Sequence, residues 1–127
     1  MTTFAEFSAT NRSRVERWHP DFKGARNDWT GADWANAMQG EAGEAGNIVK
    51  KLRRIETGIR QAEQGDERDQ SYYDKLIDAL ADEIGDVYAY LDLLAQFYGI
   101  DTGEAIARKF NAISVREGFP ERIEVAR

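Results

Sequence analysis

The clearest pattern of apolar positions lies between Ser71 and Gly99, where apolar residues recur at alternating steps of three and four. This spacing places them on one face of an α-helix. The pattern therefore predicts a long central helix whose apolar face packs against another part of the protein. The residues of this face are Ile77, Leu80, Ile84, Val87, Leu91, Leu94 and Tyr98.

The stripe beside that face is also apolar, with two exceptions. Glu83 and Asp86 lie within it, three residues apart, so their carboxylates project together from the helix. A buried carboxylate without a partner is costly, or its pKa shifts until it is neutral. The two acids therefore predict a cation or a hydrogen-bonding partner at this place. The whole stripe is Leu76, Ala79, Glu83, Asp86, Tyr90, Leu93 and Phe97.

A second helix, predicted from about Gly31 to Glu56, repeats this arrangement. Glu41 and Glu44 stand three residues apart in a stripe that is otherwise largely apolar. That stripe is Trp34, Ala37, Glu41, Glu44, Ile48, Lys51 and Ile55. The apolar stripe beside it is Met38, Ala42, Ala45, Val49 and Leu52.

Small residues are frequent in the middle of this second helix, although glycine lowers helix propensity. We expect them to allow the close approach of another helix, which would bring the two acid pairs together. The small residues are Gly40, Ala42, Gly43, Ala45 and Gly46.

Two shorter helices complete the predicted secondary structure. The first extends from about Phe4 to Trp18 and begins with the capping-box pair Thr3 and Glu6. The last is capped by Asp101 and ends near Gly118. No stretch alternates as a β-strand does. The sequence therefore predicts one all-α domain over residues 1–127, resembling a four-helix bundle, with a polar connection from Thr57 to Gln70.

Composition narrows the classes of function. The formal net charge is −6, which argues against nucleic acid or an anionic membrane as a partner. The chain has no cysteine, so disulfides, thiolate catalysis and cysteine zinc sites are excluded. It has neither an apolar signal core nor a run as long as a membrane span. We expect a soluble, cytoplasmic protein.

Four carboxylates from two packed helices would form an oxygen-rich site that suits Mg²⁺ or Mn²⁺. Di-iron bundles use Glu-x-x-His motifs instead, and the one histidine, His19, lies outside both acid pairs. A Glu-x-x-Glu pair on a helix usually marks a solvated face. Here both pairs interrupt apolar stripes on the two longest helices, which favours a metal site.

Three separated blocks of the sequence resemble the MazG-like all-α nucleoside triphosphate pyrophosphohydrolases. The blocks read GEAGEAGNIVKKLRR, ADEIGDVYAYLDLLAQFYGID and RKFNAISVREGFPERI, and they occur in the order of that family. The resemblance covers about residues 34–120. It departs from many members at Gly40, where they have a further acid, and in the longer separation of the two acid pairs.

The resemblance implies hydrolysis between the α and β phosphates of a nucleoside triphosphate, which gives a nucleoside monophosphate and pyrophosphate. It implies that Glu41, Glu44, Glu83 and Asp86 bind Mg²⁺. One of these carboxylates would act as the general base; the sequence does not show which, and we expect Glu41 or Glu44. It also implies phosphate or sugar contacts for two residues of the last helix, and a homodimer or a dimer of dimers. These two residues are Lys109 and Asn111.

Other residues are weaker candidates for substrate binding. Lys51 shares the stripe of Glu41 and Glu44 and is placed to meet phosphate oxygens. Tyr90 follows Asp86 by one turn and is a candidate for contact with the sugar. His19 and two tryptophans are candidates for stacking on the base. These tryptophans are Trp18 and Trp34, of which Trp34 is expected in the core.

Two alternatives remain open from the sequence. A phosphoribosyl-ATP pyrophosphohydrolase of the same superfamily would share the acid pairs. A helical interaction module whose acids are structural, or merely hold a divalent ion, would release no pyrophosphate. The sequence does not indicate the preferred base or sugar.

Overall fold

The described part of the chain is entirely helical. The computed structural model describes residues 2–24, 26–58 and 70–125, which form four helices and no strand. They are α1 (Phe4–Trp18), α2 (Gly31–Glu56), α3 (Gln70–Phe97) and α4 (Thr102–Glu117). The all-α prediction is confirmed, and the predicted helices agree with these bounds to within two residues. Most of the polar connection predicted from Thr57 to Gln70 lies outside the described residues.

The helix ends follow the predicted capping chemistry. At α1 the hydroxyl of Thr3 accepts from the backbone N–H of Glu6 at 3.2 Å, and the Glu6 carboxylate accepts from the N–H of Thr3 at 2.8 Å. At α4 a carboxylate oxygen of Asp101 accepts from the N–H of Glu104 at 2.8 Å. Gly118 ends α4 with φ +73°, a left-handed conformation that glycine adopts without strain. Local side chains therefore satisfy the first orphan N–H groups of both helices.

The chain divides into two compact units, each of which has its own buried residues. The first unit combines Met1–Trp34 with Leu91–Arg127, and the second is Ala35–Tyr90. The core of the first unit includes Val15, Phe22, Trp34 and Leu93, so Trp34 is a core residue as expected.

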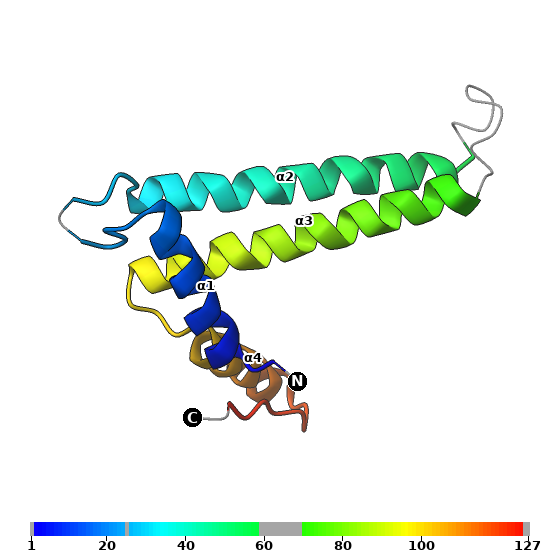
Figure 1. Cartoon of the computed structure of the whole chain (residues 1–127). Helices are drawn as coiled ribbons and strands as arrows, with labels where there is room; N and C mark the ends of the chain where they lie inside the picture. Colours follow the sequence, from blue (N-terminus) through cyan, green and yellow to red (C-terminus); the bar gives the residue numbers. More distant parts are fainter. Residues whose placement is uncertain (1, 25, 59–69, 126–127) are drawn as a thin grey trace. The chain divides into compact units, whose positions relative to one another are not determined.

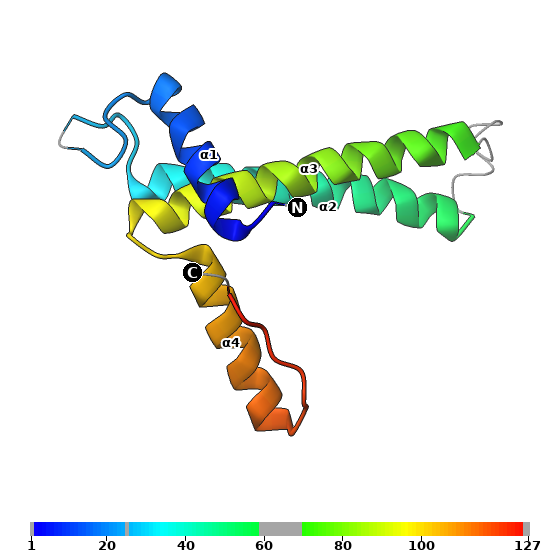
Figure 2. The same ribbon diagram turned by 60° about the horizontal axis from the view of Figure 1, so that its bottom comes forward.

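The second unit is a pair of antiparallel helices, which Figures 1 and 2 show side by side. Its core is the cluster of Ile48, Leu52 and Leu76, and the partly buried side chains packed on it come from the same two helices. These are Ile55, Tyr72, Tyr73, Ala79 and Leu80.

The apolar face predicted for the central helix is largely open. In the second unit Ile77 and Ile84 are 40% and 46% exposed. Leu76, from the neighbouring stripe that carries the acids, is only 7% exposed. The acid-bearing stripe of α3 therefore faces α2, together with Leu80 of the neighbouring stripe, whereas Ile77 and Ile84 of that stripe are largely open.

The role expected for the glycines of α2 is wrong within the described chain. A Cβ added at Gly40, Gly43 or Gly46 would meet no atom of the described residues within 4 Å. These positions lie on the outer side of α2, away from Ile48 and Leu52. The two helices approach each other through larger side chains instead.

Since this space is open, Gly46→Ala is expected to stabilise the protein by about 0.5–1 kcal/mol, because alanine loses less backbone entropy than glycine in a helix interior. Urea unfolding followed by circular dichroism measures this gain. A loss of stability would show that something outside the described chain packs against Gly46.

Within residues 2–24, 26–58 and 70–125, no helix combines the length and the apolar composition of a membrane-spanning segment.

Candidate metal site

Three of the four predicted acids come together in the second unit. One carboxylate oxygen each from Glu41, Glu83 and Asp86 lies within 4.8 Å of the others. Glu41 projects from α2, and Glu83 and Asp86 project from α3. Glu44 does not belong to this group of three, although its charge acts on Glu83.

The packing of the two helices explains why these acids meet. Leu76 of α3 packs with Ile48 of α2 in the core cluster. Glu41 precedes Ile48 by seven residues, and Glu83 follows Leu76 by seven. Seven residues are about two helical turns and return to nearly the same face. Because the helices are antiparallel, both acids lie about two turns beyond the apolar cluster in the same direction.

Glu83 is the most constrained of the acids. Its Oε2 atom is closed off from solvent and has no hydrogen-bond partner among the described residues. Desolvation is the main reason why the pKa of Glu83 is raised from 4.5 to about 7, and hydrogen bonding with Glu41 and repulsion from Glu44 add to the shift. Glu83 and Glu41 cannot hydrogen-bond to each other while both carboxylates are ionised. Oε2 of Glu83 therefore needs either a proton or a cation as its partner.

The residues present fit a hard divalent cation. Every donor in the cluster is a carboxylate oxygen, which Mg²⁺ and Mn²⁺ prefer, and the chain has no cysteine to favour a softer metal. A cation at this point would supply the missing partner of Glu83 Oε2 and offset the repulsion among the acids.

Two further predicted residues belong to the same unit. Lys51 is exposed on α2 and lies seven residues after Glu44, about two turns along the same face. Tyr90 is half-buried on α3, four residues after Asp86. Their positions agree with the predicted stripes, and their contacts with a substrate stay predictions.

His19 lies in the first unit, within an aromatic cluster. Its ring centroid is 4.9 Å from that of Trp29 and 5.1 Å from that of Trp34. Its Nδ1 atom is 2.7 Å from a carboxylate oxygen of Asp28, and this hydrogen bond is the main cause that lowers the pKa of Asp28. Trp18 is 68% exposed. The aromatic wall expected from Trp18, His19 and Trp34 thus forms in part, and Trp29 takes part in it.

Asn111 and Lys109 both lie on α4, also in the first unit. The side-chain amide of Asn111 donates to the carbonyl of Ile123 at 3.0 Å and accepts from its N–H at 2.8 Å. These bonds attach the C-terminal segment to α4 and account for Asn111 without a substrate. Lys109 is exposed. Contact of either residue with substrate stays a prediction.

The sequence pattern did not indicate the buried carboxylate of Asp92, which is 2% exposed. It accepts hydrogen bonds from Ser8, from Asn11 at 2.9 Å, from Gln96 at 2.8 Å and from Thr102 at 3.3 Å. These donors belong to α1, α3 and α4, all within the first unit. A polar pair four residues apart in an otherwise apolar stretch, Asp92 and Gln96, was the available signal.

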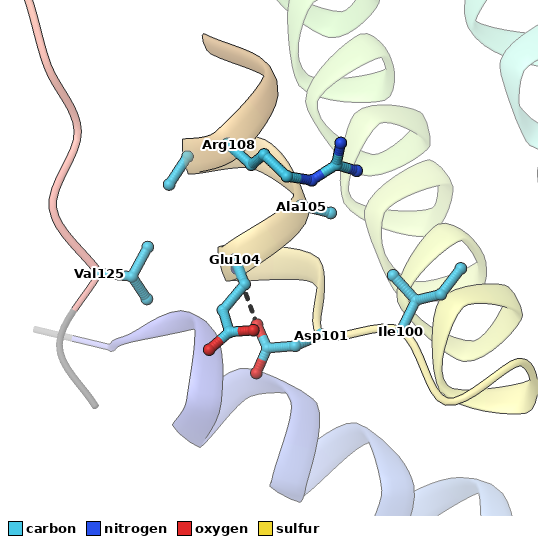
Figure 3. A pocket seen from close by; sticks show the side chains of 7 residues that line it. Ile100, Asp101, Glu104, Ala105, Arg108 and Val125 are labelled. Carbon is cyan, nitrogen blue, oxygen red and sulfur yellow. Dashed lines mark hydrogen bonds between the residues drawn. The ribbon is translucent and has the colours of Figure 1, made fainter. Parts of the chain in front are cut away.

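A surface pocket near the start of α4 holds none of the predicted site residues. Figure 3 shows Asp101, Glu104 and Arg108 at this pocket, with the N–H of Glu104 bonded to Asp101. The cavity volume is about 460 Å³. Asp101 already serves there as the cap of α4, so the pocket is a weaker candidate site than the acid cluster.

No protein-family profile, no curated protein and no solved structure matches the chain.

Proposed function

We propose that this protein is a Mg²⁺-dependent nucleoside triphosphate pyrophosphohydrolase that cleaves between the α and β phosphates. The observation that carries the proposal is the unpaired, closed-off Oε2 of Glu83 among the carboxylates of Glu41 and Asp86. Such a site is suited to a divalent cation, and a triphosphate is the common substrate class that arrives with one. The resemblance of three sequence blocks to MazG-like enzymes supports the reaction.

The acids and the lysine would have different roles. Glu41, Glu83 and Asp86 would hold the metal, with Glu44 completing the set. When bound, the metal would neutralise phosphate charge and lower the pKa of an attacking water. Glu41 or Glu44 would accept the proton of that water, and Lys51 would meet phosphate oxygens as a point charge.

The finer architecture belongs to the same proposal. We infer that the helices form part of a bundle in a homodimer or homotetramer in the cytoplasm. Lys109, Asn111, Tyr90 and His19 remain candidates for contact with the nucleotide. Mn²⁺ is expected to replace Mg²⁺, because it takes the same oxygen ligands.

Pyrophosphate release from a panel of NTPs and dNTPs tests the reaction. We expect release with Mg²⁺ and none with a chelator, at a rate that depends on the base and sugar. Asp82→Asn is a matched control, since Asp82 is an exposed acid on α3 outside the cluster. This variant should retain activity.

A folded protein that releases no pyrophosphate from any member of the panel would contradict the proposal. Phosphoribosyl-ATP would then be the next substrate to assay. If phosphoribosyl-ATP released no pyrophosphate either, the remaining hypothesis would be the metal-binding interaction module.

A further inference from the structure

The C-terminal segment of the first unit, residues 119–125, runs back along α4 without regular secondary structure (Figure 2). Near its end the side chains alternate in exposure, because Ile123 and Val125 are half-buried whereas Arg122 and Glu124 are exposed. This alternation is typical of an extended chain that turns every second side chain toward a surface. The half-buried side chains therefore mark the side of the segment that faces the helix.

Asn111 of α4 holds this segment by its backbone. Its amide nitrogen donates to the carbonyl of Ile123 at 3.0 Å, and its amide oxygen accepts from the N–H of the same residue at 2.8 Å. Within the described chain, residues 120–125 make no hydrogen bond from backbone to backbone. A single side chain therefore supplies the polar attachment of the segment to the helix.

The far end of the segment packs on a glycine of α4. A Cβ added at Gly103 would lie 3.3 Å from Cγ1 of Val125 and 3.2 Å from Cβ of Phe4 in α1. The missing side chain at Gly103 allows both residues to come this close. Figure 3 shows Val125 at the pocket near the start of α4, which it lines together with residues of the helix. Release of the segment would therefore remove one wall of that pocket.

The turn that leads into the segment is stabilised separately. Gly118 ends α4, and Arg122 then donates to the carbonyls of Phe119 and Glu121 at 2.8 and 2.7 Å. These bonds lie within the turn and do not connect it to α4. The helix therefore does not need the segment to form its own end.

We propose that residues 119–125 form a strap that opens and closes over α4 while the helix stays folded, with Asn111 as its clasp. The closed strap is held by the two hydrogen bonds of Asn111 and by the contacts of two half-buried side chains, Ile123 and Val125. A segment with so few buried contacts opens at a lower cost in free energy than a packed helix unfolds.

The strap contains none of the candidate metal ligands, which all lie in the second unit. Its opening is therefore expected whether or not the protein hydrolyses nucleotides, and it can be measured without a nucleotide.

Trypsin digestion of the full chain tests the strap, because Arg122 directly precedes the clasped residue. Cleavage after Arg122 requires the strap to leave α4, so its rate follows the population of the open form. In the wild type we expect this cleavage to be roughly tenfold or more slower than in the free peptide FPERIEV, since two hydrogen bonds oppose opening. It should still be faster than cleavage after Lys109, which requires α4 to unfold.

Asn111→Ala should accelerate cleavage after Arg122 roughly tenfold through the loss of both bonds. Cleavage after Lys109 and the helix content by circular dichroism should stay unchanged. Val125→Asp changes only the strap, outside all four helices, and should accelerate cleavage at the same place. Arg116→Ala, at an exposed position of α4, is the matched control and should leave the rate after Arg122 unchanged.

Three results would overturn the proposal. Equal rates after Arg122 in Asn111→Ala and the wild type would show that Asn111 is not the clasp. Cleavage of the wild type as fast as the free peptide would show that the strap is not closed. Cleavage after Arg122 and Lys109 that rises together in Val125→Asp would show that the strap does not open independently of the helix.

Discussion

Glu83→Gln is expected to abolish pyrophosphate release while leaving the fold intact and, above neutral pH, more stable. The amide removes the charge that burial disfavours and donates to the neighbouring carboxylates of Glu41 or Glu44. Altering a residue that only orients a metal ligand lowers activity about 10–100-fold. Removal of a metal ligand itself should therefore lower activity by more than about 100-fold. Turnover with saturating Mg²⁺ measures this effect.

The stability gain depends on pH in a defined direction. The pKa of Glu83 is about 7 in the folded protein and 4.5 when unperturbed, so between these values the folded state holds a proton that the unfolded state has released. The stability of the wild-type protein should therefore fall as pH rises from about 4.5 to about 7. Glu83→Gln lacks this dependence, and the two proteins should be equally stable near pH 4 and differ most above pH 7.

Mg²⁺ gives a second measurement of the same site. A ligand that binds only the folded state stabilises it, so Mg²⁺ should raise the melting temperature of the wild-type protein at pH 8 and leave that of Glu83→Gln unchanged. Asp82→Asn should respond as the wild type does. If Glu83→Gln retained both turnover and the Mg²⁺ response, Glu83 would not be a metal ligand.

The helices were predictable because their signals are local. Thr3 and Asp101 cap their helices within three residues, and Gly118 ends α4 through its own conformation. The meeting of Glu41 with Glu83 was predictable for a different reason. When two long helices each carry acids in an otherwise apolar stripe, both stripes are buried if they face each other. The acids of the two helices then meet.

Other features depended on contacts that periodicity does not contain. Both α2 and α3 have two adjacent apolar stripes, and only the packed structure shows which one faces the other helix. The glycines of α2 belong to neither stripe, and the close approach expected from them is not made within the described chain. His19 was noticed, but its bond to Asp28 and its contact with Trp29 depend on the conformation of the loop.

Asp92 illustrates the same limit, and it carries the largest predicted effect on stability. Two of its donors, Ser8 and Asn11, are more than 80 residues away in sequence. Asp92→Ala would remove the carboxylate that both of them, and Thr102, donate to, and Gln96 would keep only its bond to the carbonyl of Ser8. Hydrogen bonds to a charged group contribute about 1.5–3 kcal/mol each, and they are not additive, so we expect a loss on the order of 3–5 kcal/mol. That is a large part of the stability of a domain.

Fluorescence can locate this loss within the protein. All three tryptophans lie in the segment Met1–Trp34 of the first unit, so their emission reports on the unit that contains Asp92. In urea, Asp92→Ala should shift the fluorescence transition at least as far as the circular dichroism transition of the whole chain.

Asp92→Asn keeps one acceptor oxygen and should lose less stability. Asp78→Ala, an exposed acid on α3, should change little. If Asp92→Ala were as mild as Asp78→Ala, the buried carboxylate would not hold α1, α3 and α4 together.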